Sequence, residues 1–118
     1  EVAGATARRH CGRDATTVAI DNLYFKSGAY LNDIIVLIGK VTHVGHTSME
    51  VRVDTYREEQ DGTRHPINRA YFVMVAMGDD GKPTPVPALI LENDGERMEW
   101  DNAIKRRELR LVRKKEGF

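Results

Sequence analysis

A strictly alternating stretch near the middle of the chain constrains the fold most strongly. Over residues 49–54 (MEVRVD), every second side chain is apolar and those between are charged. This period of two is typical of a strand with one buried and one solvent-facing side. The four residues before it, 45–48 (GHTS), are small or polar and predict a tight turn. We therefore expect a β-strand over residues 49–57, joined by a short link to the strand before it.

Three further segments carry strand signals: residues 16–26, 34–43 and 67–77. The last of them is apolar on both faces from Ala70 onward, which predicts a central strand covered on both sides. Because the links between these long strands are short, antiparallel pairing is favoured.

The links carry turn residues. Residues 27–28 (SG) and 32–33 (ND) punctuate the first link, and 61–62 (DG) is a strong hairpin signal. The proline-rich stretch 83–87 predicts an extended segment that cannot join a central strand.

A helix is predicted at each end of the chain. Residues 1–10 end near Gly12, which suits the left-handed position past a helix end. Small residues at Ala3, Gly4 and Ala7 would let a sheet approach this helix closely. One helix, four strands and a second helix predict an α+β fold.

The C-terminal helix begins at Asn93, with Glu96 at the spacing of a capping box. Acidic residues near its start and basic residues near its end match the helix dipole. Trp100, Ile104 and Leu111 have helical spacing and predict a packing stripe.

Composition narrows the possible functions. The 118 residues suffice for one domain, and 18 basic residues balance 18 acidic ones. Because no net field results, neither nucleic acid nor an anionic membrane is expected as a partner. No apolar run approaches the ~20 residues that span a bilayer. Cys11 is the single cysteine, so a reducing, cytoplasmic compartment is expected.

Isolated residues give weak chemical signals. His43 and His46 have an odd separation, which would place them on opposite faces of a strand, so no metal site is predicted. Asp21 lacks a nearby histidine or second carboxylate and is interpreted as a strand-edge or interface residue. The basic segment 105–115 fits either a solvated helix end or an anion site; without interleaved aromatics it does not indicate nucleic acid.

Taken together, these pieces resemble the hotdog-fold acyl-CoA thioesterases of the cytosolic acyl-CoA hydrolase type. The matching segments, in order, are residues 1–4, 9–11, 17–21, 39–42, 47–51, 70–73, 75–76 and 85–87, with Phe25 and the closing helix. The resemblance spans nearly the whole chain. It implies a hotdog fold, in which a curved antiparallel sheet wraps around one central helix and a C-terminal helix follows.

The resemblance also implies a reaction: hydrolysis of acyl-CoA thioesters to free fatty acid and CoA, with no cofactor required. The expected catalytic acid is an Asp immediately before Glu1, so no catalytic residue is assigned within the chain. Residues 1–118 are interpreted as a single hotdog domain that lacks its N-terminal strand, its glycine-rich loop and the start of its central helix. The expected assembly is a homo-oligomer, a dimer of hotdogs built into a trimer of dimers.

In contrast to the catalytic acid, the residues expected to bind CoA lie within the chain. The resemblance implies contacts from the first strand along the pantetheine, from the turn near the nucleotide, and from a guanidinium of the final helix to a phosphate. The predicted CoA-binding residues are Val18, Ala19, Ile20, Thr47, Ser48, Met49, Arg106, Arg107 and Arg110.

Two other functions stay open at this point. One is a non-catalytic hotdog module that binds CoA or acyl-CoA. The other is a structural oligomerisation domain in which residues 70–77 are buried against a partner.

Overall fold

A computed structural model describes residues 1–25 and 33–117 of the chain. Its elements, in order, are α1 (Val2–Cys11), β1 (Asp14–Phe25), β2 (Ile34–Val44), β3 (Ser48–Glu58), β4 (Arg64–Met77) and α2 (Asp94–Lys115). The predicted order of helix, four strands and helix is therefore confirmed. The first predicted link, including 27–28 and residue 32, lies outside the described residues.

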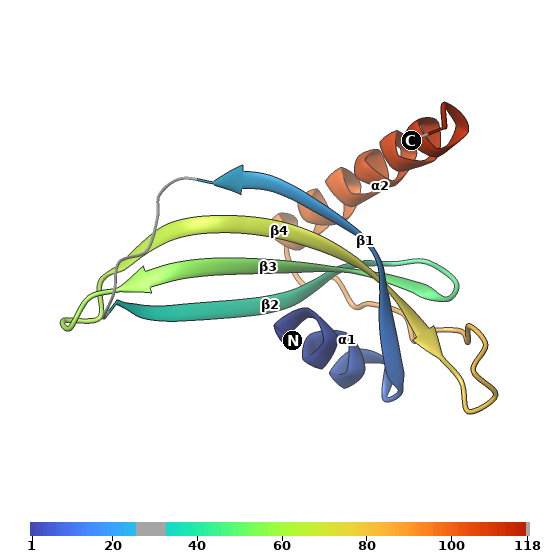
Figure 1. The fold of residues 1–118 in the computed structure, drawn as a ribbon, viewed down its shortest axis with the longest axis horizontal. Helices are drawn as coiled ribbons and strands as arrows, with labels where there is room; N and C mark the ends of the chain where they lie inside the picture. Colours follow the sequence, from blue (N-terminus) through green and yellow to red (C-terminus); the bar gives the residue numbers. More distant parts are fainter. Residues whose placement is uncertain (26–32, 118) are drawn as a thin grey trace.

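The strands form one antiparallel sheet in the order β1-β4-β3-β2. Figure 1 shows that the sheet is long and curved, with α1 and α2 at separate places along it. Strand β4 lies between β1 and β3, as its apolar sequence predicted, and it starts three residues earlier than residue 67. The registers shift at Val18 in β1 and at Thr42 in β2. Such bulges bend a strand and redirect its side chains.

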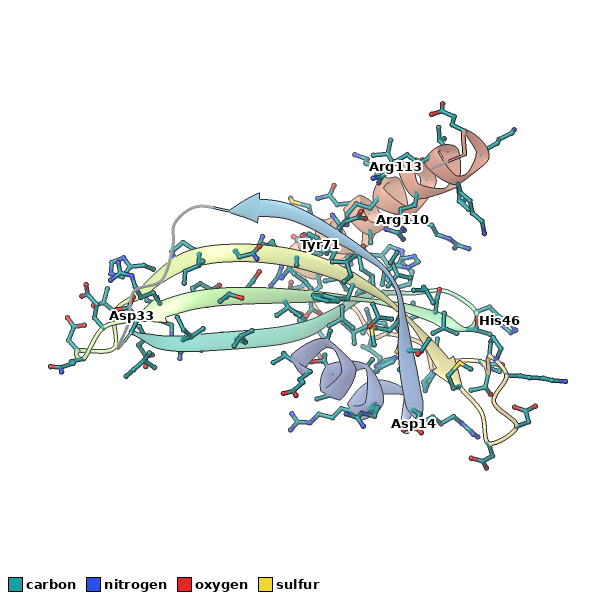
Figure 2. The ribbon with its side chains drawn as sticks, viewed as in Figure 1. Asp14, Asp33, His46, Tyr71, Arg110 and Arg113 are labelled. Carbon is teal, nitrogen blue, oxygen red and sulfur yellow. The ribbon has the colours of Figure 1, made fainter. Side chains whose placement is uncertain are left out.

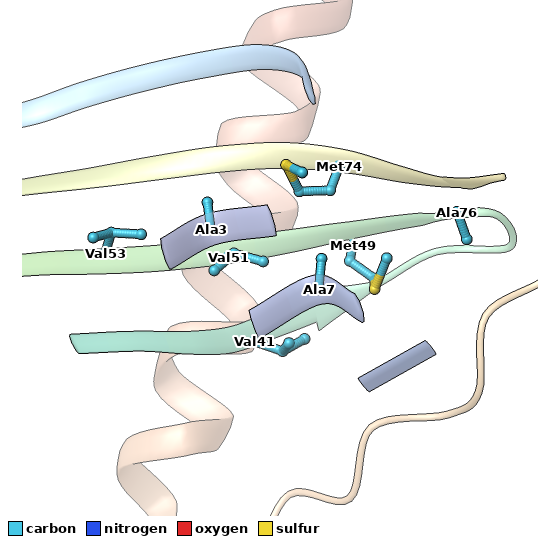
Figure 3. Packing of buried hydrophobic residues seen from close by; sticks show 8 residues of the cluster. All are labelled: Ala3, Ala7, Val41, Met49, Val51, Val53, Met74 and Ala76. Carbon is cyan, nitrogen blue, oxygen red and sulfur yellow. The ribbon is translucent and has the colours of Figure 1, made fainter. Parts of the chain in front are cut away.

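Helix α1 covers one face of the sheet with small side chains. Ala3 and Ala7 are buried against Met49, Val51 and Met74, and Figure 3 shows α1 in front of these strands with α2 behind them. Alanines allow the backbone of the helix to lie close to the sheet, so this face is packed and apolar.

The close approach of α1 depends on a glycine that we did not predict. Gly4 has open space where a side chain would begin, so it is not a contact residue. Gly39 on β2 is the contact residue instead, because a Cβ there would collide with Thr6 and touch Val2 of α1. The glycine that admits the helix therefore lies on the strand.

The prediction that β3 has one buried and one solvent-facing side is wrong for its second side, which lies on the face of the sheet opposite α1. Met49, Val51 and Val53 are buried as expected. However, the predicted solvent-facing side is covered: Glu50 is only 3% exposed and Asp54 only 6%. Helix α2 crosses this face, and arginines neutralise both carboxylates. Charged residues alternate along β3 because they form a buried ionic layer.

Helix α2 begins as predicted. The side chain of Asn93 accepts a hydrogen bond from the backbone N–H of Glu96 at 2.9 Å, while the Glu96 carboxylate accepts from the N–H of Glu92 at 2.8 Å. The predicted packing stripe is wrong in part. Trp100 packs against His43, but Ile104 and Leu111 are exposed, because Ala103 is the residue that faces the sheet.

The remaining links follow the sequence. Gly45 donates to the carbonyl of Ser48 at 2.9 Å, which closes the β2–β3 turn. Gly62 has a positive φ of 89°, and the Asp61 carboxylate accepts from the N–H of Thr63 at 2.9 Å. The proline segment stays extended outside the sheet, apart from one bridge between Met77 and Pro83. In the part of the chain that the structure describes, neither helix has the length and apolar character needed to cross a membrane.

Candidate functional site

A cavity of about 610 Å³ lies between β1, β3 and α2, on the face of the sheet opposite α1. Its floor comes from the two strands and Val73 of β4, and its wall comes from α2. The residues that line it are Val18, Ala19, Ile20, Asp21, His43, Ser48, Met49, Glu50, Val73, Ala103, Arg107, Arg110, Leu111, Arg113 and Lys114.

Seven of the nine predicted CoA-binding residues meet in this one cavity. They come from three elements that are far apart in sequence: residues 18–20 of β1, 48–49 of β3, and Arg107 and Arg110 of α2. Met49 borders the cavity although its side chain is only 1% exposed and belongs to the core under α1. The bulge at Val18 lies at the part of β1 that borders the cavity. Thr47 and Arg106 are not among the lining residues.

Arg106 binds other side chains of the protein rather than facing the cavity. Its Nη2 and Nε donate to the two carboxylate oxygens of Glu50 at 2.7 and 2.9 Å. Its guanidinium also lies over the ring of Tyr71, 3.6 Å from the centroid. Burial lowers the pKa of Arg106, but the hydrogen bonds and charge of Glu50 raise it by more. Arg106 is therefore a permanently charged structural residue, held by two hydrogen bonds to Glu50 and by the ring of Tyr71.

Arg110 is partly engaged. Its Nη1 donates to the Asp21 carboxylate at 3.1 Å, and Arg113 reaches the same carboxylate at 3.6 Å. Figure 2 shows Arg110 and Arg113 on the part of α2 that extends beyond Tyr71. Asp21 thus faces the helix and pairs with two cations, a more specific role than the strand-edge or interface position predicted from sequence.

Arg107 has no carboxylate partner among the residues that the structure describes. It lines the cavity and is exposed. One of its terminal nitrogens comes within 3.8 Å of the point where a Cβ on Gly45 would stand. The guanidinium therefore lies beside the β2–β3 turn. Its five donors are available for an anion.

His43 is a cavity residue that sequence reasoning missed. Its ring packs against Trp100, with centroids 4.1 Å apart. Burial is the main cause that lowers the pKa of His43; Arg106, Arg107 and Arg110 lower it further, and Glu50 opposes them. Burial and the positive charge of the three arginines thus favour the neutral form of the His43 imidazole. No local pattern indicated this role, since the contact with Trp100 joins residues 57 positions apart.

Tyr71 and Glu99 extend the charged layer away from the cavity. The Tyr71 hydroxyl donates to the Glu99 carboxylate at 3.2 Å, and Arg52 donates to the same group at 2.9 Å. Burial and the charge of Glu99 raise the pKa of Tyr71. Within residues 1–25 and 33–117, no three His, Cys, Asp or Glu side chains gather in a way that could hold a metal ion.

Comparison with known proteins identifies relatives over the whole chain. The uncharacterized acyl-CoA thioester hydrolase YkhA of Bacillus subtilis is 34% identical over 116 residues, which cover 98% of this chain and 67% of the relative. The cytosolic acyl coenzyme A thioester hydrolase of Rattus norvegicus is 30% identical over 120 residues, covering 99% of this chain and 31% of the relative. The chain thus spans about a third of the longer relative.

Solved structures show the same fold. A crystal structure of an apo-hexameric acyl-CoA thioesterase has a TM-score of 0.84 at 35% identity, over 94% of this chain and 72% of that one. The acyl-CoA hydrolase of Staphylococcus aureus, in complex with butyryl coenzyme A and coenzyme A, has a TM-score of 0.87 at 31% identity, over 97% and 70%.

The profile of the Thioesterase superfamily matches residues 1–63, more than half of the chain. With the relatives and the four-stranded curved sheet, this match confirms the hotdog fold and the family resemblance. The chain belongs to the Thioesterase superfamily.

Proposed function

We propose that the whole protein hydrolyses acyl-CoA thioesters to a free fatty acid and CoA, and that this chain supplies the CoA-binding side. One observation carries the proposal: residues of β1, the β2–β3 turn region and α2 converge on one cavity, with the unpaired Arg107 at its wall. CoA carries several phosphate charges, and a guanidinium offers each of them a bidentate contact. Hydrolases among the relatives, one of them solved with CoA, support the assignment.

The three predicted arginines divide into separate roles under this proposal. Arg107 contacts a CoA phosphate directly. Arg110 contributes charge while it stays paired with Asp21. Arg106 is excluded from direct contact because Glu50 and Tyr71 occupy its guanidinium. No cofactor is required, since water and a carboxylate suffice for thioester hydrolysis.

The catalytic acid is proposed to be an Asp just before Glu1, in a segment that would complete the hotdog domain. The exposed edges of the sheet support this incompleteness. Strands β1 and β2 are the outer strands of the described sheet, and Val18, Ile20, Ile34 and Leu37 are about half exposed there. Exposed apolar edges usually pair with another strand or chain.

We assign these two edges to the upstream strand and to the second subunit of a dimer of hotdogs, three of which would form a hexamer. The hexameric thioesterase among the similar structures supports an oligomer. We also place the protein in the cytoplasm, in keeping with the rat relative that is named cytosolic.

The test is release of CoA thiol from a short and a long acyl-CoA by the full-length protein. We expect turnover that disappears when the Asp before Glu1 is replaced by Asn. Absence of turnover together with tight CoA binding would instead favour a non-catalytic CoA-binding module. Absence of both would leave a structural oligomerisation domain.

The site itself is tested with Arg107→Ala. Loss of a phosphate contact should weaken CoA binding by roughly 1–3 kcal/mol. The matched control is Lys105→Ala, which removes one positive charge from an exposed position of α2 that does not line the cavity. Equal affinities for the two variants would remove Arg107 from the site.

A further inference from the structure

Helix α2 lies on the sheet with very little apolar contact. All of α2 is described, and Ala103 is its one buried apolar residue. In contrast, Met98, Leu109, Leu111 and Val112 are 51–65% exposed. A helix usually docks by burying an apolar stripe. Apart from the ring contact between Trp100 and His43, polar contacts set the position of α2 on the sheet.

Glu50 makes the most deeply buried of these polar contacts. Its carboxylate accepts two hydrogen bonds from Arg106 and a third, at 2.7 Å, from the hydroxyl of Thr42. Stacking of Arg106 on Tyr71 fixes the guanidinium from the other side. A bidentate pair of this kind is directional, so it restrains rotation as well as distance.

The restraint acts beside the cavity. Arg107 follows Arg106 in the helix, and Arg110 lies one turn beyond it. When Arg106 is held against the sheet, the rotation of α2 about its axis is determined, and with it the direction of the next residues. A modest rotation would carry Arg107 away from the cavity wall.

We propose that Glu50 is a positioning residue for the anion site: through Arg106, it sets the rotation of α2 at which Arg107 and Arg110 face the cavity. This inference rests on the proposed function, which assigns a CoA phosphate to that cavity. Glu50 also lines the cavity, where its negative charge alone would oppose a phosphate. Positioning by Glu50 should strengthen CoA binding, whereas its negative charge should weaken it. Replacing Glu50 by the neutral, similarly shaped Gln removes both effects, so the sign of the change in CoA affinity shows which one is larger.

The experiment uses Glu50→Gln in the full-length protein. Its matched control is Asp54→Asn, on the same face of β3. Asp54 is also buried and also accepts two bonds from an arginine, Arg69, at 2.6 and 3.1 Å. Within the described residues its link to α2 is indirect: Arg52 lies 3.3 Å from Asp54 and donates to Glu99 of α2. Arg106→Lys is a second variant that keeps the charge and loses the planar fork.

Two measurements are made on each variant. Hydrogen exchange of the α2 amides, without ligand, reports whether the helix is anchored. Titration with CoA reports whether the anion site is formed. For Glu50→Gln we expect faster exchange in α2 and CoA binding about tenfold weaker, a typical coupling within one hydrogen-bonded network. The loss should appear mainly in KM rather than in kcat. Asp54→Asn should bind CoA as tightly as the parent, because neither Asp54 nor its partners Arg52 and Arg69 line the cavity.

Equal or tighter CoA binding by Glu50→Gln would overturn the proposal, because electrostatics would then be the larger effect. The same loss in Asp54→Asn would also overturn it, because a general loss of structure would suffice. A parent protein that binds no CoA would refute the proposed function instead. In that case the exchange measurement still decides whether Glu50 anchors α2.

Discussion

The two helices are held on opposite faces of one sheet by different physics. Helix α1 packs with alanines on an apolar surface that includes Met49 and Val51. Helix α2 is held by ion pairs, among them Glu50 with Arg106 and Asp21 with Arg110. Apolar packing stabilises the fold but provides no charged or hydrogen-bonding groups for a ligand. Paired charges contribute less net stability, but they leave guanidinium groups beside a cavity.

The contrast is sharpest at two neighbouring residues of β3. Met49 and Glu50 are both almost fully buried, and the period of the strand sends them to opposite faces. Substitutions at these two positions therefore test the two kinds of packing on the same strand.

Glu50→Ala should cause the largest loss of stability. It leaves the buried guanidinium of Arg106 without a counter-charge, which typically costs about 3–5 kcal/mol. Equilibrium denaturant unfolding measures this cost. The double variant Glu50→Leu with Arg106→Met should recover most of it, because an apolar pair of similar volume replaces the ions. A single variant within about 1 kcal/mol of the parent would contradict a buried ionic layer.

Met49→Ala should cost about 2–5 kcal/mol through the cavity it leaves under α1. Because the lost contacts are apolar, the cost should be the same at low salt and at 1 M salt, where the Debye length is only about 3 Å. Met98→Ala, on the exposed side of α2, is the control and should change stability by less than about 0.5 kcal/mol. A strong salt dependence for Met49→Ala would show that the two faces are not independent.

Gly39→Ala and Gly4→Ala should have opposite signs. A methyl group at Gly39 collides with Thr6 of α1 and should destabilise the protein by about 1–3 kcal/mol. A methyl group at Gly4 meets open space within a helix and should stabilise by up to about 1 kcal/mol. Thermal unfolding of both variants measures the difference. A tolerated Gly39→Ala would mean that α1 does not depend on close approach to β2.

The stability of the protein should depend on pH through His43, which lies on the charged face of the sheet. His43 has a pKa below the ordinary value of about 6.5, so below that pH the unfolded state binds more protons than the folded state. Stability should therefore fall as the pH drops from 7 toward the folded-state pKa. His43→Gln should flatten this part of the profile. An NMR titration of His43 with an ordinary or raised pKa would contradict the arrangement around Trp100.

The sequence alone predicted the elements and their order well. The strands and helices, the turn at Asp61 and the cap at Asn93 follow from local signals and lie where they were expected. The helical stripe was wrong at Ile104 and Leu111, which are exposed. The apolar character of residues 70–77 also predicted the central place of β4. Resemblance to the family pointed to nine binding residues, of which the structure gathers seven around one cavity. Local sequence patterns therefore predicted the order of the helices and strands, and resemblance to the family predicted most of the residues now found around the cavity.

Only the tertiary structure decided which charges are buried and which arginine is available. Alternation along β3 predicts an apolar face and a polar face. It does not predict that α2 will cover the polar face, because the contact between Glu50 and Arg106 joins residues 56 positions apart. Arg106 and Arg107 are adjacent and chemically alike in sequence. They differ because the crossing of α2 sets one against Glu50 and leaves the other beside Gly45. That difference arises from three-dimensional packing, which a one-dimensional pattern does not carry.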